Sequence, residues 1–308
     1  MVDTVNAIVF PGGFNLPLWT AEKQGLFAHR NLEVKLHLTT SSMEQLSGLI
    51  RGEWDLALTG IDNVVAYQEG QGEAEIDREP DLFVFMGGDD AFLRLVVQGD
   101  IRSYADLKGK TLTVDAMTTG FAFVLRKMLA ANGIAESDVK FERAGGVMQR
   151  WEALKAGKHA GTLLLTPFDL LAEKVGLRVL QKASDVFPRY QGIVGATRRT
   201  WAKENPETLK NFIRAYLDAL AWLFTPANRN AAAQILVEKV PNMTPELAAA
   251  TCAIFLGKSG FEPEAKLDME GFRKVLELRS EYGKPQKTLT DPAKYIDLSY
   301  YEAARKTA

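Results

Sequence analysis

Residues 16–60 read LPLWTAEKQGLFAHRNLEVKLHLTTSSMEQLSGLIRGEWDLALTG. The pattern predicts an amphipathic helix, an apolar strand, a second helix, and another apolar strand that ends in Thr59-Gly60. Helices that alternate with strands in this way are typical of a parallel sheet. Ligands of such sheets bind at the ends of the strands, so the residues that follow each strand are the first candidates for a site.

The helix and strand boundaries inside this stretch follow from individual residues. Gly25 ends the helix that begins near Leu16. Ser41 and Glu44 have the S-x-x-E spacing of a capping box, which predicts that the second helix starts at Ser41. The strands are expected at Leu32–Leu38 and Leu56–Thr59.

The same alternation of strands and helices continues on both sides of residues 16–60. Val5–Phe10 reads as a strand before Pro11-Gly12-Gly13, and Leu82–Met86 reads as a strand before Gly87–Asp90. A second α/β block follows over about residues 93–190, and the chain is predicted to be helical after Gly195. The Gly87–Asp90 and Gly192–Gly195 segments join the two blocks, and two crossings of this kind permit a hinge.

Composition and charge exclude several classes of protein. The 308 residues are 46% apolar and 25% charged, with a net charge of −2, so we expect neither nucleic acid nor an anionic membrane as a partner. No apolar run is long enough for a transmembrane helix. The start, MVDTVNAIVF, is not a signal peptide. Cys252 is the single cysteine and is expected to be a buried structural thiol.

Catalytic and metal-binding patterns are sparse. His29, His37 and His159 lie on different predicted elements and lack metal-ligand spacing, and no G-x-S-x-G, C-x-x-C or H-E-x-x-H motif occurs. Gly12-Gly13 follows a strand, but the full dinucleotide motif and a P-loop lysine are absent. We therefore predict no catalytic residue, no metal and no cofactor.

The recurrent signal is a hydroxyl, amide or glycine residue between a strand and the helix that follows it. Free backbone N–H groups and the helix dipole favour anions at such positions. The alternative for each hydroxyl is a helix cap without ligand contact. The positions are Gly13 to Asn15, Ser41-Ser42, Thr59-Gly60, Thr118-Thr119-Gly120 and Thr166.

Charged and aromatic candidates near these strand ends are few. Arg143 ends a predicted strand and is either a partner for a ligand anion or a solvated side chain. Asp89-Asp90 lies at a crossing between the blocks, where capping or hinge hydrogen bonds are favoured over a ligand amine. Phe14 is expected to form a wall of the cleft, and Phe168 is a second candidate, whereas Trp19 fits core packing better.

Several segments carry a resemblance to a known superfamily. They are PLWTAEKQGLFAHRNLEVKL, SSMEQLSGLIRGEWDLALTG, DLKGKTLTV, TPFDLLAEKVG, YQGIVGATRRTWAKENPETLKNFIRAYLDALAWL and YIDLSYYEAA, which span nearly the whole chain in order. Together they resemble solute-binding proteins for alkanesulfonates, taurine, nitrate and thiamine-precursor pyrimidines, which have the type II periplasmic-binding-protein fold.

The resemblance implies an α/β fold of two lobes, each with a mixed, mostly parallel sheet flanked by helices. Residues 1–90 and 192–308 would form the first lobe, which includes a helical C-terminal segment, and residues 91–191 the second. It also implies delivery of a solute to the membrane permease of an ATP-driven (ABC) importer. We expect a monomer that works outside the cytoplasm after removal of a signal peptide, and the alternative is a cytoplasmic protein. The family's ligand loops match Gly12, Gly13, Phe14, Asn15, Ser41, Ser42, Thr59, Gly60, Thr118, Thr119, Gly120 and Thr166.

One branch of this superfamily consists of enzymes, and the chain departs from it. The pyrimidine synthases carry a segment with His and Cys that this sequence lacks, so we predict a binding protein. The hydroxyl-rich strand ends and Arg143 favour an organic anion, such as a sulfonate or carboxylate, held by hinge closure. The alternatives are binding of a thiamine-precursor pyrimidine, an enzyme of pyrimidine biosynthesis on the same fold, or a ligand-sensing domain.

Overall fold

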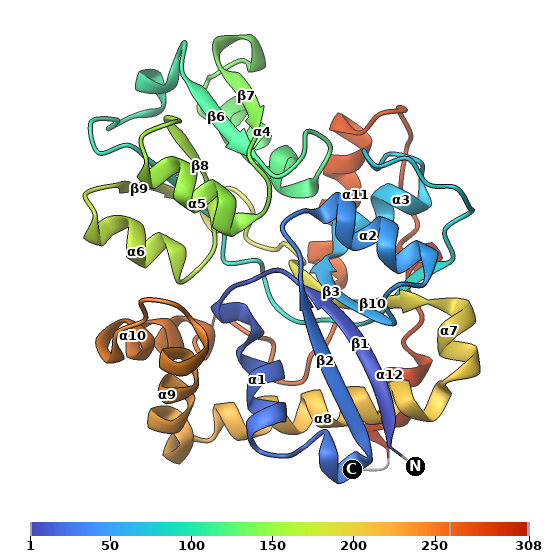
Figure 1. Cartoon of the computed structure of the whole chain (residues 1–308). Coiled ribbons are helices and arrows are strands. Elements are labelled where there is room, and N and C mark those ends of the chain that lie inside the picture. Colours follow the sequence, from blue (N-terminus) through green and yellow to red (C-terminus); the bar gives the residue numbers. More distant parts are fainter. Residues whose placement is uncertain (1, 259, 307–308) are drawn as a thin grey trace.

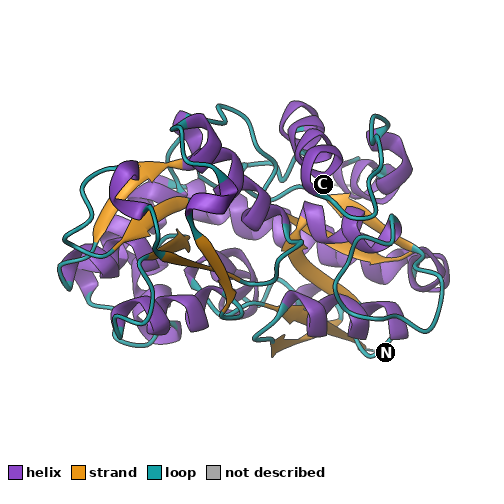
Figure 2. Ribbon diagram, turned by 90° about the horizontal axis from the view of Figure 1, so that it is seen from above, coloured by secondary structure: helices purple, strands orange, loops and turns teal. Residues whose placement is uncertain are grey.

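The computed structural model describes residues 2–258 and 260–306 and has two lobes (Figure 1). Each lobe contains a five-stranded mixed sheet, with strand orders β2-β1-β3-β10-β4 and β7-β6-β8-β5-β9. We call the lobe around the first sheet lobe I and the lobe around the second lobe II. Seen from above, the strands lie in two groups, one in each half of an elongated molecule, with helices around them (Figure 2). The prediction of a two-lobed α/β fold is confirmed.

Lobe I begins with the alternation that the opening stretch predicts. β1 pairs in parallel with β2, Asp3 opposite Leu32 and Val9 opposite Leu38, and on its other side with β3. The elements are β1 (Asp3–Val9), η1 (Gly13–Asn15), α1 (Leu16–Lys23), η2 (Ala28–Arg30), β2 (Leu32–Leu38), α2 (Ser42–Arg51), β3 (Leu56–Gly60), α3 (Ile61–Gln68) and β4 (Leu82–Met86).

The capping box predicted at the start of α2 is confirmed at Ser41 but not at Glu44. The Ser41 hydroxyl accepts a hydrogen bond from the Met43 backbone N–H at 3.1 Å, as a cap does. Glu44 does not complete the capping box, because its Oε2 accepts instead from the Thr39 hydroxyl at 2.5 Å. The helix therefore begins where the sequence predicts it, with only half of the predicted cap.

Lobe II repeats the pattern with a different strand order. β6 is parallel to β7 and β8, and β5 is antiparallel to β8 and β9. The elements are β5 (Arg94–Val97), η3 (Tyr104–Leu107), β6 (Thr111–Val114), α4 (Gly120–Ala131), η4 (Glu136–Asp138), β7 (Lys140–Arg143), α5 (Val147–Lys155), β8 (Gly161–Leu164), α6 (Phe168–Lys174), β9 (Arg178–Lys182) and η5 (Ala183–Asp185).

The chain then returns to lobe I through a strand that the sequence analysis missed. β10 (Ile193–Arg198) runs antiparallel between β3 and β4, in the interior of the sheet. A Cβ on Gly195 would lie 2.5 Å from the Phe85 ring, so β10 has a glycine where the neighbouring strand β4 has a large side chain. Such small residues give a weak strand pattern. The expectation of helix directly after Gly195 was therefore wrong.

The remaining helices complete lobe I, and α11 also touches lobe II, because it packs against both α3 and α4. The apolar face of α8 is buried at Leu209, Phe212, Ile213, Tyr216 and Leu220. The elements are α7 (Arg199–Glu204), α8 (Pro206–Phe224), η6 (Pro226–Asn228), α9 (Arg229–Lys239), α10 (Pro245–Phe255), α11 (Met269–Tyr282), η7 (Pro292–Tyr295) and α12 (Ser299–Arg305).

Two further sequence predictions concern burial and membranes. Cys252 on α10 is buried, and burial raises the pKa of its thiol to about 11, which confirms the buried thiol. Within residues 2–258 and 260–306, no helix has the length and hydrophobicity needed to cross a membrane.

Asp89 joins the two chain segments that cross between the lobes. Its Oδ1 accepts hydrogen bonds from the backbone N–H groups of Ala91 at 2.8 Å and Ile193 at 2.9 Å. Ala91 lies on the first crossing, from lobe I to lobe II, and Ile193 on the second, so one carboxylate oxygen holds both. Asp89 is thus at the hinge, where the sequence analysis favoured hinge hydrogen bonds over a ligand amine.

The hinge gives a prediction of pH-dependent stability. Burial raises the pKa of Asp89 from 3.8 to about 7, so the folded protein binds its proton more tightly than the unfolded chain. The free energy of unfolding should therefore fall as the pH rises from about 4 to about 7. In Asp89→Asn, which keeps the acceptor oxygen but cannot ionise, urea unfolding should show a shallower fall. Equal pH slopes in the two proteins would contradict the prediction.

Candidate functional site

A cavity between the lobes is the candidate site. Its volume is about 490 Å³, including the part that is open to solvent. Both lobes contribute to a lining that combines three phenylalanine rings with two aspartates and one arginine. The lining residues are Phe10, Phe14, Gly60, Asp62, Asn63 and Ile193 from lobe I, and Asp115, Thr119, Phe121, Gly146, Val147, Arg150 and Leu165 from lobe II.

The cavity lies at the carboxyl ends of parallel strands, as ligand sites of α/β sheets do. In lobe I, Phe10 follows β1, and Asp62 stands in the first turn of the helix after β3. In lobe II, Asp115 follows β6 and Leu165 follows β8. The sheet topology thus brings together residues that are far apart in the sequence.

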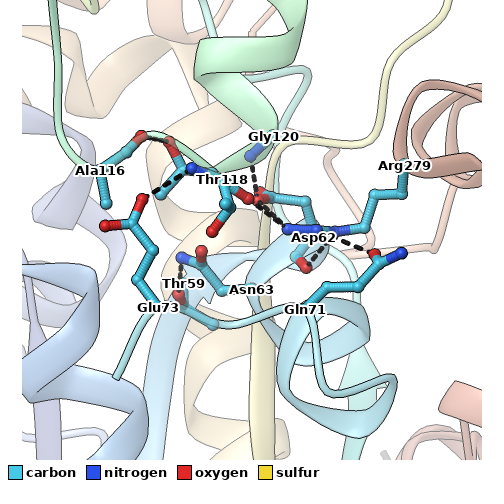
Figure 3. A network of polar contacts seen from close by, with 10 residues as sticks. Thr59, Asp62, Asn63, Gln71, Glu73, Ala116, Thr118, Gly120 and Arg279 are labelled. Carbon is cyan, nitrogen blue, oxygen red and sulfur yellow. Dashed lines mark hydrogen bonds and ion pairs between the residues drawn. The ribbon is translucent and has the colours of Figure 1, made fainter. Parts of the chain in front are cut away.

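Asp62 and Arg279 form a buried charge pair beside the cavity. Their side chains are 4% and 0% exposed, and Arg279 Nη2 lies 3.9 Å from Asp62 Oδ2. The same carboxylate oxygen accepts a hydrogen bond from the Gly120 backbone N–H of lobe II (Figure 3). Burial raises the pKa of Asp62, and the charge of Arg279 and the N–H of Gly120 oppose that rise.

Arg279 also fixes three segments by its other hydrogen bonds. It donates from Nε to the Asp62 carbonyl at 3.1 Å, from Nη1 to Gln71 Oε1 at 3.2 Å, and from Nη2 to the Thr118 carbonyl at 2.6 Å (Figure 3). Thr118 belongs to lobe II, so this buried side chain of α11 joins the two lobes.

Two more contacts join the lobes around the cavity. Glu73 of lobe I accepts a hydrogen bond from the Thr118 backbone N–H at 2.8 Å and forms an ion pair with Arg143 of lobe II. The Gly146 backbone N–H of lobe II donates to the Thr40 carbonyl of lobe I at 2.8 Å. The lobes are therefore in direct contact, as in a closed arrangement.

Asp115 and Arg150 are the charged residues that lobe II contributes to the lining. Asp115 Oδ2 accepts from the Ser42 backbone N–H of lobe I at 3.3 Å, whereas its Oδ1 is buried without a hydrogen-bond partner. Arg150 donates to the carbonyls of Gly145 at 3.1 Å and Leu163 at 3.3 Å. Burial lowers the pKa of Arg150, and Asp115 opposes that change.

The residues predicted from strand ends fall into three groups. Phe14, Gly60 and Thr119 line the cavity. Ser42, Thr118, Gly120 and Arg143 lie in the contacts between the lobes, and the ion pair of Arg143 with Glu73 occupies the guanidinium that we expected to face a ligand anion.

The third group supports the site from behind or lies elsewhere. Asn15 donates to the Phe10 carbonyl at 2.7 Å, and Thr59 accepts from Asn63 at 3.0 Å. Thr166 donates to Asp169 at 3.3 Å. Gly12 and Gly13 precede Phe14 in the loop after β1, Ser41 caps α2, and Asp89 is at the hinge.

Sequence reasoning missed most of the charged lining. Asp62 stands in the first turn of α3, where an acidic residue also suits the helix dipole, and Asp115 lies one position after β6. Arg150 is inside a helix, and Arg279 is separated from Asp62 by 217 positions. Asp115 was the one that the strand-end rule could have found, because it directly follows β6.

Solved structures share this fold at low sequence identity. The ligand-binding component of an ABC-type import system from Staphylococcus aureus, with zinc bound, is 14% identical, with coverage of 98% of this chain and 99% of that one and a TM-score of 0.77. The alkanesulfonate-binding protein SsuA from Xanthomonas axonopodis pv. citri, bound to MOPS, is 16% identical, with coverage of 91% and 92% and a TM-score of 0.72. The periplasmic nitrate-binding protein NrtA from Synechocystis PCC 6803 is 13% identical, with coverage of 99% and 89% and a TM-score of 0.79.

These likenesses confirm the periplasmic-binding-protein fold. The sequence matches no curated protein. In the part of the chain that the structure describes, no group of three or more His, Cys, Asp or Glu side chains is placed to hold a metal ion. The NMT1-like family model matches residues 9–237, which is most of the chain. The chain therefore belongs to the NMT1-like family.

Proposed function

We propose that this protein is the solute-binding component of an ABC importer and captures a small organic solute between its lobes. The observation that carries the proposal is a cavity lined by both lobes and bordered by direct hydrogen bonds between them. A solute in that cavity touches both lobes at once, so it stabilises the closed arrangement relative to the open one. Such differential affinity is what shifts the population toward closure.

Closure proceeds by rotation about the two crossings near Asp89 and Ile193. In the open form the strand ends are hydrated and admit the solute. On closing, Asp62 meets the Gly120 N–H and Glu73 meets the Thr118 N–H, so the contacts between the lobes form around the trapped molecule. The phenylalanine rings exclude water from its apolar part.

The sequence alone favoured an anionic solute, but the arginines at the cavity are already engaged by other groups of the protein. Arg143 is paired with Glu73, and Arg150 donates to two backbone carbonyls. The charge of Asp62 is paired with the buried Arg279, but Asp115 presents a buried carboxylate oxygen without a donor, which an oxyanion cannot satisfy. The aromatic and acidic lining instead favours the alternative solute, a heterocycle of the pyrimidine type.

Binding is a better account of the site than catalysis. Among its lining residues there is no cysteine or histidine to act as a nucleophile or base. The Asp62 carboxylate is held by Arg279 and the Gly120 N–H, so its contacts suit a structural role better than that of a catalytic base. We further propose that the protein works outside the cytoplasm and passes its solute to a membrane permease.

The test is the identity and fate of a co-purified molecule. We expect denaturation of the purified protein to release one organic species in near-equal molar amount to the chain, detected by mass spectrometry. Adding that fraction back to refolded, ligand-free protein should raise the melting temperature and reduce the radius of gyration in small-angle scattering. Conversion of the returned molecule into another species would support an enzyme instead.

A further inference from the structure

We infer that Asp115 anchors the solute and that the cavity takes a flat molecule bearing an N–H donor group, such as an amidine, an amine or an amino-substituted heterocycle. The inference rests on the proposed function, since it names the chemistry of the solute that the cleft holds. By this inference, Asp115 is the residue that makes the site bind solutes with N–H donors more tightly than anionic solutes.

The first observation is an unsatisfied acceptor. Asp115 is 7% exposed, and its Oδ1 is buried without any hydrogen-bond partner while the residue lines the cavity. Its other oxygen is already engaged by the Ser42 N–H. Buried carboxylate oxygens without a donor are costly, and native proteins rarely leave them so. A donor on the solute would complete this carboxylate.

The second observation is that the lining offers further side-chain acceptors, while both guanidiniums near it already bond to other groups of the chain. Asp62 adds a second carboxylate, and Asn63 uses one of its two amide N–H groups on Thr59, so its amide oxygen is an acceptor and its other N–H a donor. Of the two guanidiniums nearby, Arg150 is bonded to the Gly145 and Leu163 carbonyls and Arg279 to three oxygens. An N–H donor therefore finds acceptors in this cavity, and the one that lacks any partner, Asp115 Oδ1, can be satisfied only by a donor.

The third observation concerns the apolar walls. Phe10 and Phe14 come from lobe I and Phe121 from lobe II, so aromatic rings face the solute from both sides of the cleft. Such rings suit a flat apolar body, and their faces also attract a cationic group. The negative charges of Asp62 and Asp115 equal in number the positive charges of Arg150 and Arg279. A solute with either a neutral or a cationic donor group is therefore compatible with the charge of the site.

The experiment compares small ring compounds that differ in their polar head. Benzamidine carries a cationic donor head, 4-aminopyrimidine a neutral one, and benzoate and benzenesulfonate anionic heads. We expect calorimetric titration of ligand-free protein to give at least about tenfold tighter binding for a donor probe than for either anion, as one hydrogen bond to a charged group provides. The relative affinity of the two donor probes shows whether the site prefers a cation or a neutral heterocycle.

The decisive variant is Asp115→Asn, which keeps the shape but presents an amide. It should weaken donor-probe binding about tenfold or more and strengthen benzoate binding, because the amide N–H can donate to a carboxylate. A gain for the anion cannot come from misfolding. The matched control is Asp169→Asn, another buried acid of lobe II (3% exposed) with an unpartnered Oδ1 outside the cavity lining, which should leave the affinities unchanged.

Three results would overturn the inference. They are equal or tighter wild-type binding of the anions, no binding of either donor probe at millimolar concentration, and an unchanged donor-to-anion ratio in Asp115→Asn. None of these touches the proposed function, which fails instead if no molecule can be recovered from the purified protein or if the recovered molecule is chemically converted.

Discussion

Replacement of Arg279 by methionine is expected to lower the free energy of unfolding by about 3–5 kcal/mol, the usual cost of leaving one partner of a buried ion pair alone. The Arg279 side chain is fully buried and faces the equally buried Asp62 carboxylate. Methionine fills a similar volume but donates no hydrogen bond, so Gln71 Oε1 and the Asp62 and Thr118 carbonyls also lose their donor. The measurement is urea unfolding at neutral pH.

Two further variants separate the ion pair from other effects of the substitution. Arg273→Met makes the same change at an exposed position of the same helix and should cost less than about 0.5 kcal/mol. Adding Asp62→Asn to Arg279→Met removes the stranded charge, so the double variant should be more stable than the sum of the single losses predicts. A loss in Arg279→Met no larger than that in Arg273→Met would refute the structural importance of the pair.

The elements that sequence predicted well are those with strong local signals. β2 and β4 have the predicted bounds, because the alternating pattern of β2 ends at Thr39 and the apolar run of β4 ends at Gly87. α2 begins where Ser41 can cap it. β10 has no such signal: its Gly195 pairs with Leu58 and Met86 and makes room for the Phe85 ring, and only the folded sheet shows that need.

Among the site residues, too, those with a local sequence signal were predicted and those without one were missed. Phe14, Gly60 and Thr119 were predicted because each follows a strand, and the sheet topology carries strand ends to the cavity. Arg143 also ends a strand, but its partner, Glu73, comes from a loop of the other lobe. The sequence has no local sign of such a pair. The same holds for Asp62 and Arg279, which only the packing of α11 against α3 and α4 brings together.

Gly120→Ala is expected to block closure of the lobes without unfolding them. Gly120 begins α4, and its N–H bonds to Asp62 of the opposite lobe. A Cβ at this position would lie 2.5 Å from the Asp62 Cβ, far inside van der Waals contact, so the lobes must separate to admit it. The affinity for the recovered solute should fall by about 5- to 150-fold, the usual range for coupling between a conformational change and binding. Small-angle scattering should show no contraction when the solute is added.

Loss of stability and loss of closure can be told apart with a second glycine near the other end of the same helix. Gly133 has φ +74° and no atom within reach of an added Cβ, so Gly133→Ala strains the backbone of lobe II without touching lobe I. That variant should lose about 1 kcal/mol of stability and still contract around the solute with nearly wild-type affinity. If both variants bound the solute equally well, the Asp62–Gly120 contact would not form part of the closed state; if both lost affinity in proportion to their stability, general weakening of lobe II would explain the result. A loss of affinity and contraction confined to Gly120→Ala would assign the effect to closure, because only that side chain meets the opposite lobe.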